Sequence, residues 1–140
     1  MKYTSFFVPG KPQGKARPRV TLVKGHAHAY TPKTTKEYEQ QIRDAYIEAG
    51  GDMFDTDIPL HVIVDMRFTP PKNTPKKRYE DVLIYSRPLI RPDVDNVLKT
   101  VLDALNGVAY EDDKQVVDVI LHKRYDREAG IKVVVSDGSL

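Results

Sequence analysis

Residues 94–106 carry an apolar stripe that predicts one amphipathic helix, and acidic residues lie just before its start and just after its end. The Asn-Gly pair at 106–107 is a helix stop, because glycine adopts the left-handed backbone that closes a helix. Asp93 and Asp95 therefore fall at the helix start, and the acidic run 111–113 follows the stop. The apolar positions recur at steps of three and four residues: Val94, Val97, Leu98, Val101, Leu102 and Leu105.

The chain between these two acidic groups is long enough to return to the start of the helix. From Asp95 to Asn106 a helix rises roughly 17 Å, at about 1.5 Å per residue. An extended chain from Asn106 to Asp113 reaches at most about 25 Å, so a reversal with an almost straight return would bring Asp113 beside Asp93 and Asp95. Carboxylates held that close need a cation, and Mg2+ prefers oxygen ligands together with water and substrate phosphates. The pattern favours a site that acts on a phosphodiester.

The same residues also fit an ordinary helix boundary. Asp93 would then be an N-cap, and Asp95 a first-turn acid that the helix dipole favours. Asp95 and Lys99 would form a surface ion pair four residues apart, and residues 112–113 would belong to a turn before a strand. A D-x-D pattern alone does not decide between the two interpretations.

Longer runs of sequence resemble a known family. The run PDVDNVLK-x-VLDALNG at 92–107, followed by YEDDKQVVD at 110–118, is similar to the RusA family of Holliday junction resolvases, found in bacteria and especially in their prophages. The dense part of this match covers about a fifth of the chain. Nearer the N-terminus, GKARPR at 14–19 and YTP at 30–32 resemble the phage-type branch of that family.

The resemblance implies a small, homodimeric endonuclease that depends on Mg2+, with Mn2+ as a substitute, and that cuts four-way DNA junctions. The family's aspartate triad corresponds to Asp93, Asp95 and Asp113, which would bind the metal. Its essential lysine corresponds to Lys99, and these four residues would be catalytic. A four-way junction has near two-fold symmetry, so a C2 dimer with one site per subunit suits two matching nicks. Asp103, one turn beyond Lys99, would pair with that lysine or orient it.

Length and composition predict a single cytoplasmic domain over residues 1–140. The chain has no cysteine, which excludes disulfides, thiolate zinc sites and a cysteine nucleophile. It also has no apolar run of membrane-spanning length and no signal-peptide pattern. The net charge of +2 hides an asymmetry: residues 1–36 hold eight Lys or Arg and no Asp or Glu, whereas residues 37–140 hold fourteen basic and twenty acidic residues.

Two basic groups are candidate contacts to DNA phosphates. The first lies among prolines and glycines that predict mostly loop, and the second lies between a proline-rich stretch at 70–75 and the acidic site. For each group the alternative is a solvated surface segment. His26 and His28 are expected to contact DNA or solvent and not to bind a metal. The predicted DNA-binding residues are Lys11, Lys15, Arg17 and Arg19 in the first group and Lys76, Lys77, Arg78 and Arg91 in the second.

The remaining patterns predict an α/β (α+β) fold, a single mixed β-sheet flanked by two main helices, as in RusA-like proteins. Apolar and polar residues alternate most clearly at 60–68, which predicts a strand with one buried face. The last two strands are expected to form a hairpin through a turn at 127–130. Predicted strands lie at 3–8, 60–68, 116–125 and 131–135, and predicted helices at 34–49, 79–85 and 94–106.

Two other functions use some of the same features. A phosphatase with a D-x-D motif places it at the end of an apolar strand, but residues 86–92 are a poor strand, and a nucleotide-sugar transferase needs a longer chain. The second alternative is a non-catalytic DNA-binding protein of prophage origin, in which the basic segments bind and the acids only cap a helix. Mg2+-dependent nicking separates that alternative from the enzyme.

Overall fold

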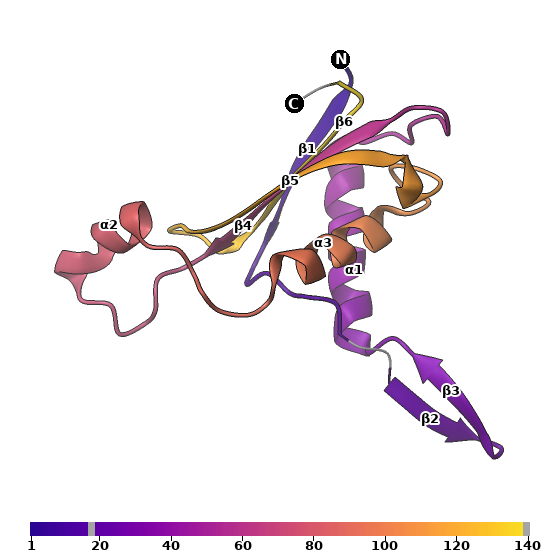
Figure 1. Ribbon diagram of the computed structural model, residues 1–140, viewed down its shortest axis with the longest axis horizontal. Helices are drawn as coiled ribbons and strands as arrows, with labels where there is room; N and C mark the ends of the chain where they lie inside the picture. The colour runs from indigo at the N-terminus through magenta and orange to yellow at the C-terminus, as the bar shows by residue number, and fades with distance from the viewer. Residues whose placement is uncertain (17–18, 139–140) are drawn as a thin grey trace.

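Figure 1 shows the computed structural model of the chain, which describes residues 1–16 and 19–138. Its centre is a four-stranded sheet in the order β1-β6-β4-β5, and β2 and β3 form a separate two-stranded sheet. The predicted mixed sheet with two main helices is confirmed, and the predicted third, shorter helix is present as α2. The elements in chain order are β1 (Tyr3–Pro9), β2 (Arg19–Val23), β3 (His26–Tyr30), α1 (Lys33–Glu48), β4 (Leu60–Phe68), α2 (Lys76–Tyr85), α3 (Val94–Leu105), the short 3-10 helix η1 (Asp113–Gln115), β5 (Val116–Tyr125) and β6 (Gly130–Ser136).

Strand β4 lies at the centre of the sheet, because both of its edges are hydrogen-bonded. It pairs parallel with β5 and antiparallel with β6. Successive side chains of a strand point to opposite faces, so the alternation predicted at 60–68 puts the apolar residues on one face. The structure confirms this, since every second side chain of the strand is buried: Leu60, Val62, Val64, Met66 and Phe68.

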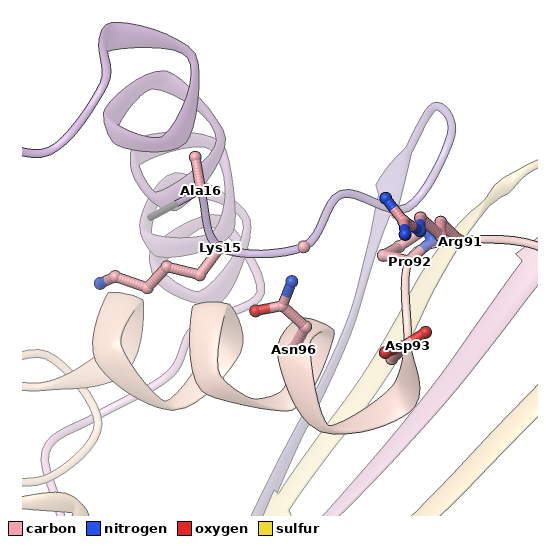
Figure 2. Close-up of a pocket in the computed structure, with 7 residues that line it drawn as sticks. Lys15, Ala16, Arg91, Pro92, Asp93 and Asn96 are labelled. Carbon is pink, nitrogen blue, oxygen red and sulfur yellow. The ribbon is translucent and has the colours of Figure 1, made fainter. Parts of the chain in front are cut away.

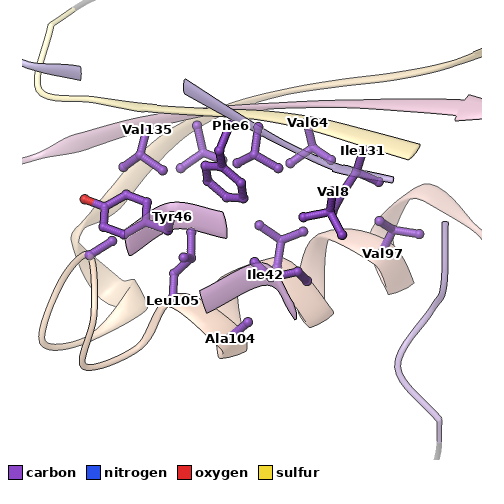
Figure 3. Close-up of a cluster of buried hydrophobic side chains, with 14 of the residues drawn as sticks. Phe6, Val8, Ile42, Tyr46, Val64, Val97, Ala104, Leu105, Ile131 and Val135 are labelled. Atoms are coloured by element: carbon purple, nitrogen blue, oxygen red, sulfur yellow. The ribbon is translucent and has the colours of Figure 1, made fainter. Parts of the chain in front are cut away.

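Helices α1 and α3 cover this buried face of the sheet and also contact each other (Figures 1 and 3). Ile42 and Tyr46 of α1 are fully buried between the strands and α3, and the Tyr46 ring packs edge-on against Phe6 with centroids 5.8 Å apart. Val97 and Leu105 of α3 are also fully buried. The apolar stripe thus fixes α3 on the core and leaves its polar side facing outward.

The predicted hairpin between residues 116–125 and 131–135 is wrong. Both strands exist, as β5 and β6, but β4 lies between them in the sheet. Because β4 and β5 are parallel, the chain must cross over between them, and the segment that carries α2 and α3 makes this crossover. The two acidic groups therefore lie within the crossover that joins the central strand β4 to the edge strand β5.

The segment between β1 and α1, residues 10–32, is called the arm below. The sequence predicted it to be mostly loop, but its second half is an antiparallel hairpin of β2 and β3, here called the ribbon (Arg19–Tyr30). Lys24 and Gly25 form the turn with φ of 51° and 78°. Two successive positive φ values are the geometry of a tight two-residue hairpin turn, whose twist matches that of the strands.

The helices lie close to their predicted positions. Helix α1 ends at Glu48 and α3 at Leu105, each one residue before the predicted end. Helix α2 begins at Lys76, three residues before the predicted start, directly after Pro75 in extended conformation. Within the described ranges, no helix is long and apolar enough to span a membrane.

Candidate active site

The first turn of α3 carries two of the predicted catalytic aspartates. Asp93 occupies the N-cap position and Asp95 lies in the first turn, and both residues are exposed. An N-cap aspartate usually accepts a hydrogen bond from a backbone N–H of the first turn. The Asp93 side chain makes no such bond. Its carboxylate is positioned at the helix start without serving as the helix cap.

The middle of α3 carries the predicted catalytic lysine beside an acid. Lys99 Nζ lies 3.4 Å from Asp103 Oδ2, one turn further on, which confirms the predicted pairing. The same oxygen accepts a 2.6 Å hydrogen bond from Lys15 Nζ of the arm, and Lys15 Nζ also donates to Glu39 Oε1 of α1 at 3.1 Å. Burial acts to lower the pKa of Lys15, but the two carboxylates outweigh it and raise the pKa above its usual value. Lys15 therefore stays charged and ties the arm to both helices.

A tight turn after α3 decides where the second acidic group lies. Gly107 has a φ of 79°, and its N–H donates to Tyr110 O at 2.7 Å. The fully buried Tyr110 donates its hydroxyl to Leu102 O, also at 2.7 Å. The chain thus uses residues 107–110 to reverse against α3 instead of returning in a straight line. Asp113 then begins η1, which contacts α3.

Asp112 and Asp113 are neighbouring carboxylates with opposite pKa shifts. Asp112 accepts a 2.9 Å hydrogen bond from the Lys114 N–H, and this bond lowers the pKa of Asp112. Burial raises the pKa of Asp113, and the carboxylates of Asp112 and Asp103 raise it further, against the opposing charge of Lys99. Burial and neighbouring carboxylates both disfavour the charged form of Asp113, and a bound cation would stabilise that form.

The donor atoms suit Mg2+, but the structure does not preform a complete metal site. Carboxylate oxygens are preferred ligands of Mg2+, which is usually held by one or two carboxylates together with water and substrate phosphates. In residues 1–16 and 19–138, no three acidic or histidine side chains lie close enough together to hold a metal ion. The structure places Asp113 near Lys99 and Asp103, and does not gather it with Asp93 and Asp95 into one ligand group.

The arm crosses the start of α3 and forms one wall of a cleft there (Figure 2). Lys15 N donates to Asn96 O at 3.4 Å, and a Cβ on Gly14 would meet Asn96 Nδ2 at 2.6 Å and Pro92 Cβ at 3.0 Å. Glycine is therefore what allows this close approach. In Figure 2 the Lys15 side chain runs along α3, away from Asp93. The cleft has a volume of about 460 Å3 and is lined by Gly14, Lys15, Ala16, Arg91, Pro92, Asp93 and Asn96.

A lysine of β5 holds the segment that leads into α3. Lys123 Nζ donates to the carbonyl oxygens of Ile90 and Pro92, the latter at 3.0 Å. The same ammonium lies 5.7 Å from the centroid of the Phe68 ring. These contacts fix the backbone immediately before Asp93. The sequence analysis missed Lys123, because a single lysine in an alternating strand gives no signal of such a contact.

The predicted DNA-binding residues differ in how they are placed. Lys15 is held between Asp103 and Glu39 with 22% of its side chain exposed, so its charge is already matched within the protein. Its contact with DNA stays a prediction. Arg17 lies outside the described residues. The other six are exposed: Lys11, Arg19, Lys76, Lys77, Arg78 and Arg91.

Comparison with known proteins decides the family. Residues 9–136 match the family model described as Endodeoxyribonuclease RusA. The chain belongs to the RusA endodeoxyribonuclease family. It is also similar to a Bacillus subtilis (strain 168) protein named "Uncharacterized protein YqaN", with 33% identity over 144 residues, covering 99% of this chain and 99% of that protein. The RusA match confirms the resemblance predicted from the acidic motifs, and it extends over the arm as well as the crossover.

Proposed function

We propose that this RusA-family chain is a Mg2+-dependent, structure-specific endodeoxyribonuclease that resolves Holliday junctions by paired symmetric nicks in DNA recombination and repair. The observation that carries the proposal is the family match over residues 9–136. The matched region includes an acid-rich helix and a basic arm, which are the two parts that metal-assisted cleavage of a polyanion needs.

Asp93, Asp95 and Asp113 are the proposed ligands of Mg2+ or its substitute Mn2+. When bound, the metal supplies positive charge at the phosphate and lowers the pKa of a bound water. Two features of the chain support these ligands. The Asp93 carboxylate is not engaged in capping, and burial together with the carboxylates of Asp112 and Asp103 raises the pKa of Asp113, whose charged form a cation would stabilise.

Lys99 is the proposed source of positive charge at the scissile phosphate. Oriented donors are most effective where negative charge develops during the reaction. The carboxylate of Asp103, 3.4 Å from Lys99 Nζ, keeps the ammonium on the outward side of α3. We assign Asp103 a positioning role through this contact and through its hydrogen bond with Lys15.

The proposal includes a homodimer. Two matching nicks across a junction with near two-fold symmetry need two equivalent sites, and a C2 dimer provides one site in each subunit. A single chain would have to release and rebind the junction between nicks.

Side-by-side cleavage of four-way, three-way and linear DNA tests the proposal. In Mg2+ we expect symmetric nicks in the four-way junction and little cutting of linear DNA, and in EDTA we expect binding without nicks. Asp113→Asn is the matched control, because it removes one charge and keeps the side-chain shape. Tight junction binding with no nicking in Mg2+ or Mn2+ would instead support the non-catalytic DNA-binding protein.

A further inference from the structure

The ribbon formed by β2 and β3 projects from the protein and has two open faces. Figure 1 shows it extending beyond the start of α1, on the side away from the four-stranded sheet. Within the described part of the chain its strands pair only with each other, and all of their residues are exposed. An isolated two-stranded hairpin is marginally stable in water. We therefore expect the ribbon to be stabilised by a binding partner that is not part of the hydrophobic core of this chain.

The register of the two strands sorts the side chains onto two chemically different faces. Arg19 lies opposite Tyr30, and Thr21 lies opposite His28, so these pairs share one side. That side, here called the polar face, also carries Val23 and His26. The other side, here called the apolar face, carries only Val20, Leu22, Ala27 and Ala29.

We propose that the polar face of the ribbon enters the major groove of a duplex arm of the DNA substrate. The inference rests on the proposed function, which supplies DNA as the partner. The polar face presents N–H and O–H donors from Arg19, Thr21, His26, His28 and Tyr30, and no acidic residue occurs anywhere in residues 1–36. Such a surface complements the phosphates and the acceptor-rich base edges of the groove.

The dimensions of the ribbon fit this partner. The major groove is wide enough to admit a two-stranded β-ribbon. An antiparallel strand advances about 3.4 Å per residue, and B-DNA advances about 3.4 Å per base pair. Side chains that alternate on one face are thus spaced about two base pairs apart. The three cross-strand rows of the polar face would therefore contact every second base pair along one groove, with Lys24 at the tip of the turn.

A second copy of this chain fits the ribbon less well. A stable protein–protein contact buries roughly 800 Å2 per partner and involves about 20–30 residues on each side. The apolar face offers four residues, two of which are alanines. The apolar face is therefore too small for a stable dimer contact, which favours the polar face as the surface that binds the partner.

Two sets of substitutions, one on each face, test the assignment in the full-length chain. The polar-face variant combines Arg19→Ala, His26→Ala and His28→Ala, and the apolar-face variant combines Val20→Thr and Leu22→Thr. Dissociation constants are measured in EDTA for a synthetic four-way junction and for a linear duplex, at several salt concentrations. Circular dichroism and Tm verify that both variants keep the wild-type fold.

We expect the polar-face variant to bind both DNAs about tenfold more weakly or worse, which is the loss of about one good base contact. Its log–log salt dependence should be shallower by about 0.9, because Arg19 releases counterions from one phosphate. The apolar-face variant should bind within about twofold of wild type. Wild-type affinity in the polar-face variant, or a larger loss in the apolar-face variant, would overturn the assignment. Sedimentation that shows dimer loss only in the apolar-face variant, together with lost binding, would assign the ribbon to a second copy.

Cleavage in Mg2+ separates this inference from the proposed function. If wild-type protein binds junctions but never nicks them, the proposed nuclease activity is wrong. The comparison of DNA binding by the two face variants then still tests the ribbon assignment independently. If wild type nicks junctions and the polar-face variant binds as tightly as wild type, the nuclease proposal stands and the ribbon assignment is wrong.

Discussion

Helix α3 and the ribbon both carry candidate functional side chains, and they are built in opposite ways. Val97, Val101 and Leu105 anchor α3 in the core, so the acids and the lysine on its outward side are held by a packed helix. The ribbon has no buried residue on either strand. Bond cleavage needs reacting groups held within fractions of an ångström, whereas attraction to a polyanion needs accessible charge. The contrast agrees with the proposals that α3 carries the chemistry and that the ribbon supplies DNA affinity.

Lys15 joins these two regions. It belongs to the arm, yet its ammonium contacts Asp103 of α3 and Glu39 of α1. Its backbone N–H also bonds to Asn96 at the helix start. The arm is therefore attached firmly where it passes the candidate active site, whereas its ribbon is fully exposed. This division inside one basic segment can be tested residue by residue.

The largest expected effect comes from the aspartates of the α3 region. Asp93→Asn, Asp95→Asn and Asp113→Asn should each lower the single-turnover cleavage rate about 100-fold or more, which is the scale of losing one group that stabilises transition-state charge. Junction affinity should be unchanged or higher, because one negative charge near the phosphates is removed. Near wild-type turnover in any one of these variants would remove that residue from the proposed metal site.

Lys99→Ala should lower the cleavage rate almost as strongly, by about 100-fold. In the proposed function the lysine acts on the phosphate and not through the metal, so metal binding measured by calorimetry should be retained. Lys99→Arg is the matched control, since it keeps the charge and tests whether the compact ammonium is required. An unchanged rate in Lys99→Ala would exclude this lysine from the active site.

A smaller effect should separate two lysines of the same arm by stability. Lys15→Ala removes the shortest ion pair of both Asp103 and Glu39, and should lower the free energy of unfolding by about 1–2 kcal/mol. Lys11 is exposed, and Lys11→Ala should change stability by less than about 0.5 kcal/mol. Urea denaturation midpoints measure both. Equal stability of the two variants would mean that Lys15 does not fasten the arm to the helices.

The smallest effect is expected from the basic first turn of α2. Lys76, Lys77 and Arg78 are exposed and lie on a helix with no buried residue. Replacing all three by alanine should flatten the log–log salt dependence of junction binding by about 0.9 for each residue that contacts phosphate. The saturated cleavage rate should not change. A salt dependence equal to that of wild type would make this turn an ordinary solvated surface.

The sequence was sufficient to locate α3 and β4, because both carry strong periodic signals that tertiary packing preserves. The pairing of strands was not predictable in the same way. A short turn between residues 125 and 131 suggested a hairpin, but β4, more than fifty residues earlier, separates β5 from β6. The ribbon was not predicted, because the prolines and glycines around it indicated a loop. Val20, Leu22 and the Lys24-Gly25 pair were nevertheless signals of a hairpin.

In the candidate site, too, local motifs were predictable from the sequence and long-range contacts were not. Sequence motifs identified Asp93, Asp95, Lys99 and Asp113, and helical spacing suggested the Lys99–Asp103 pair that the structure contains. Spacing could not show that Tyr110 would use its hydroxyl to fold the next segment against α3. The contacts of Lys15 and Lys123 could not be predicted from the sequence either, because each joins residues more than twenty positions apart.

Single-turnover cleavage of a four-way junction at saturating protein, with binding measured in parallel, tests the division between the two regions most directly. Wild type, Asp113→Asn and the polar-face ribbon variant are compared in Mg2+. We predict that Asp113→Asn binds the junction tightly and does not cut it. The ribbon variant should need more protein to saturate the junction, and then cut at the wild-type rate. A ribbon variant that binds normally but cannot cut, or an Asp113→Asn protein that cuts normally, would contradict the account.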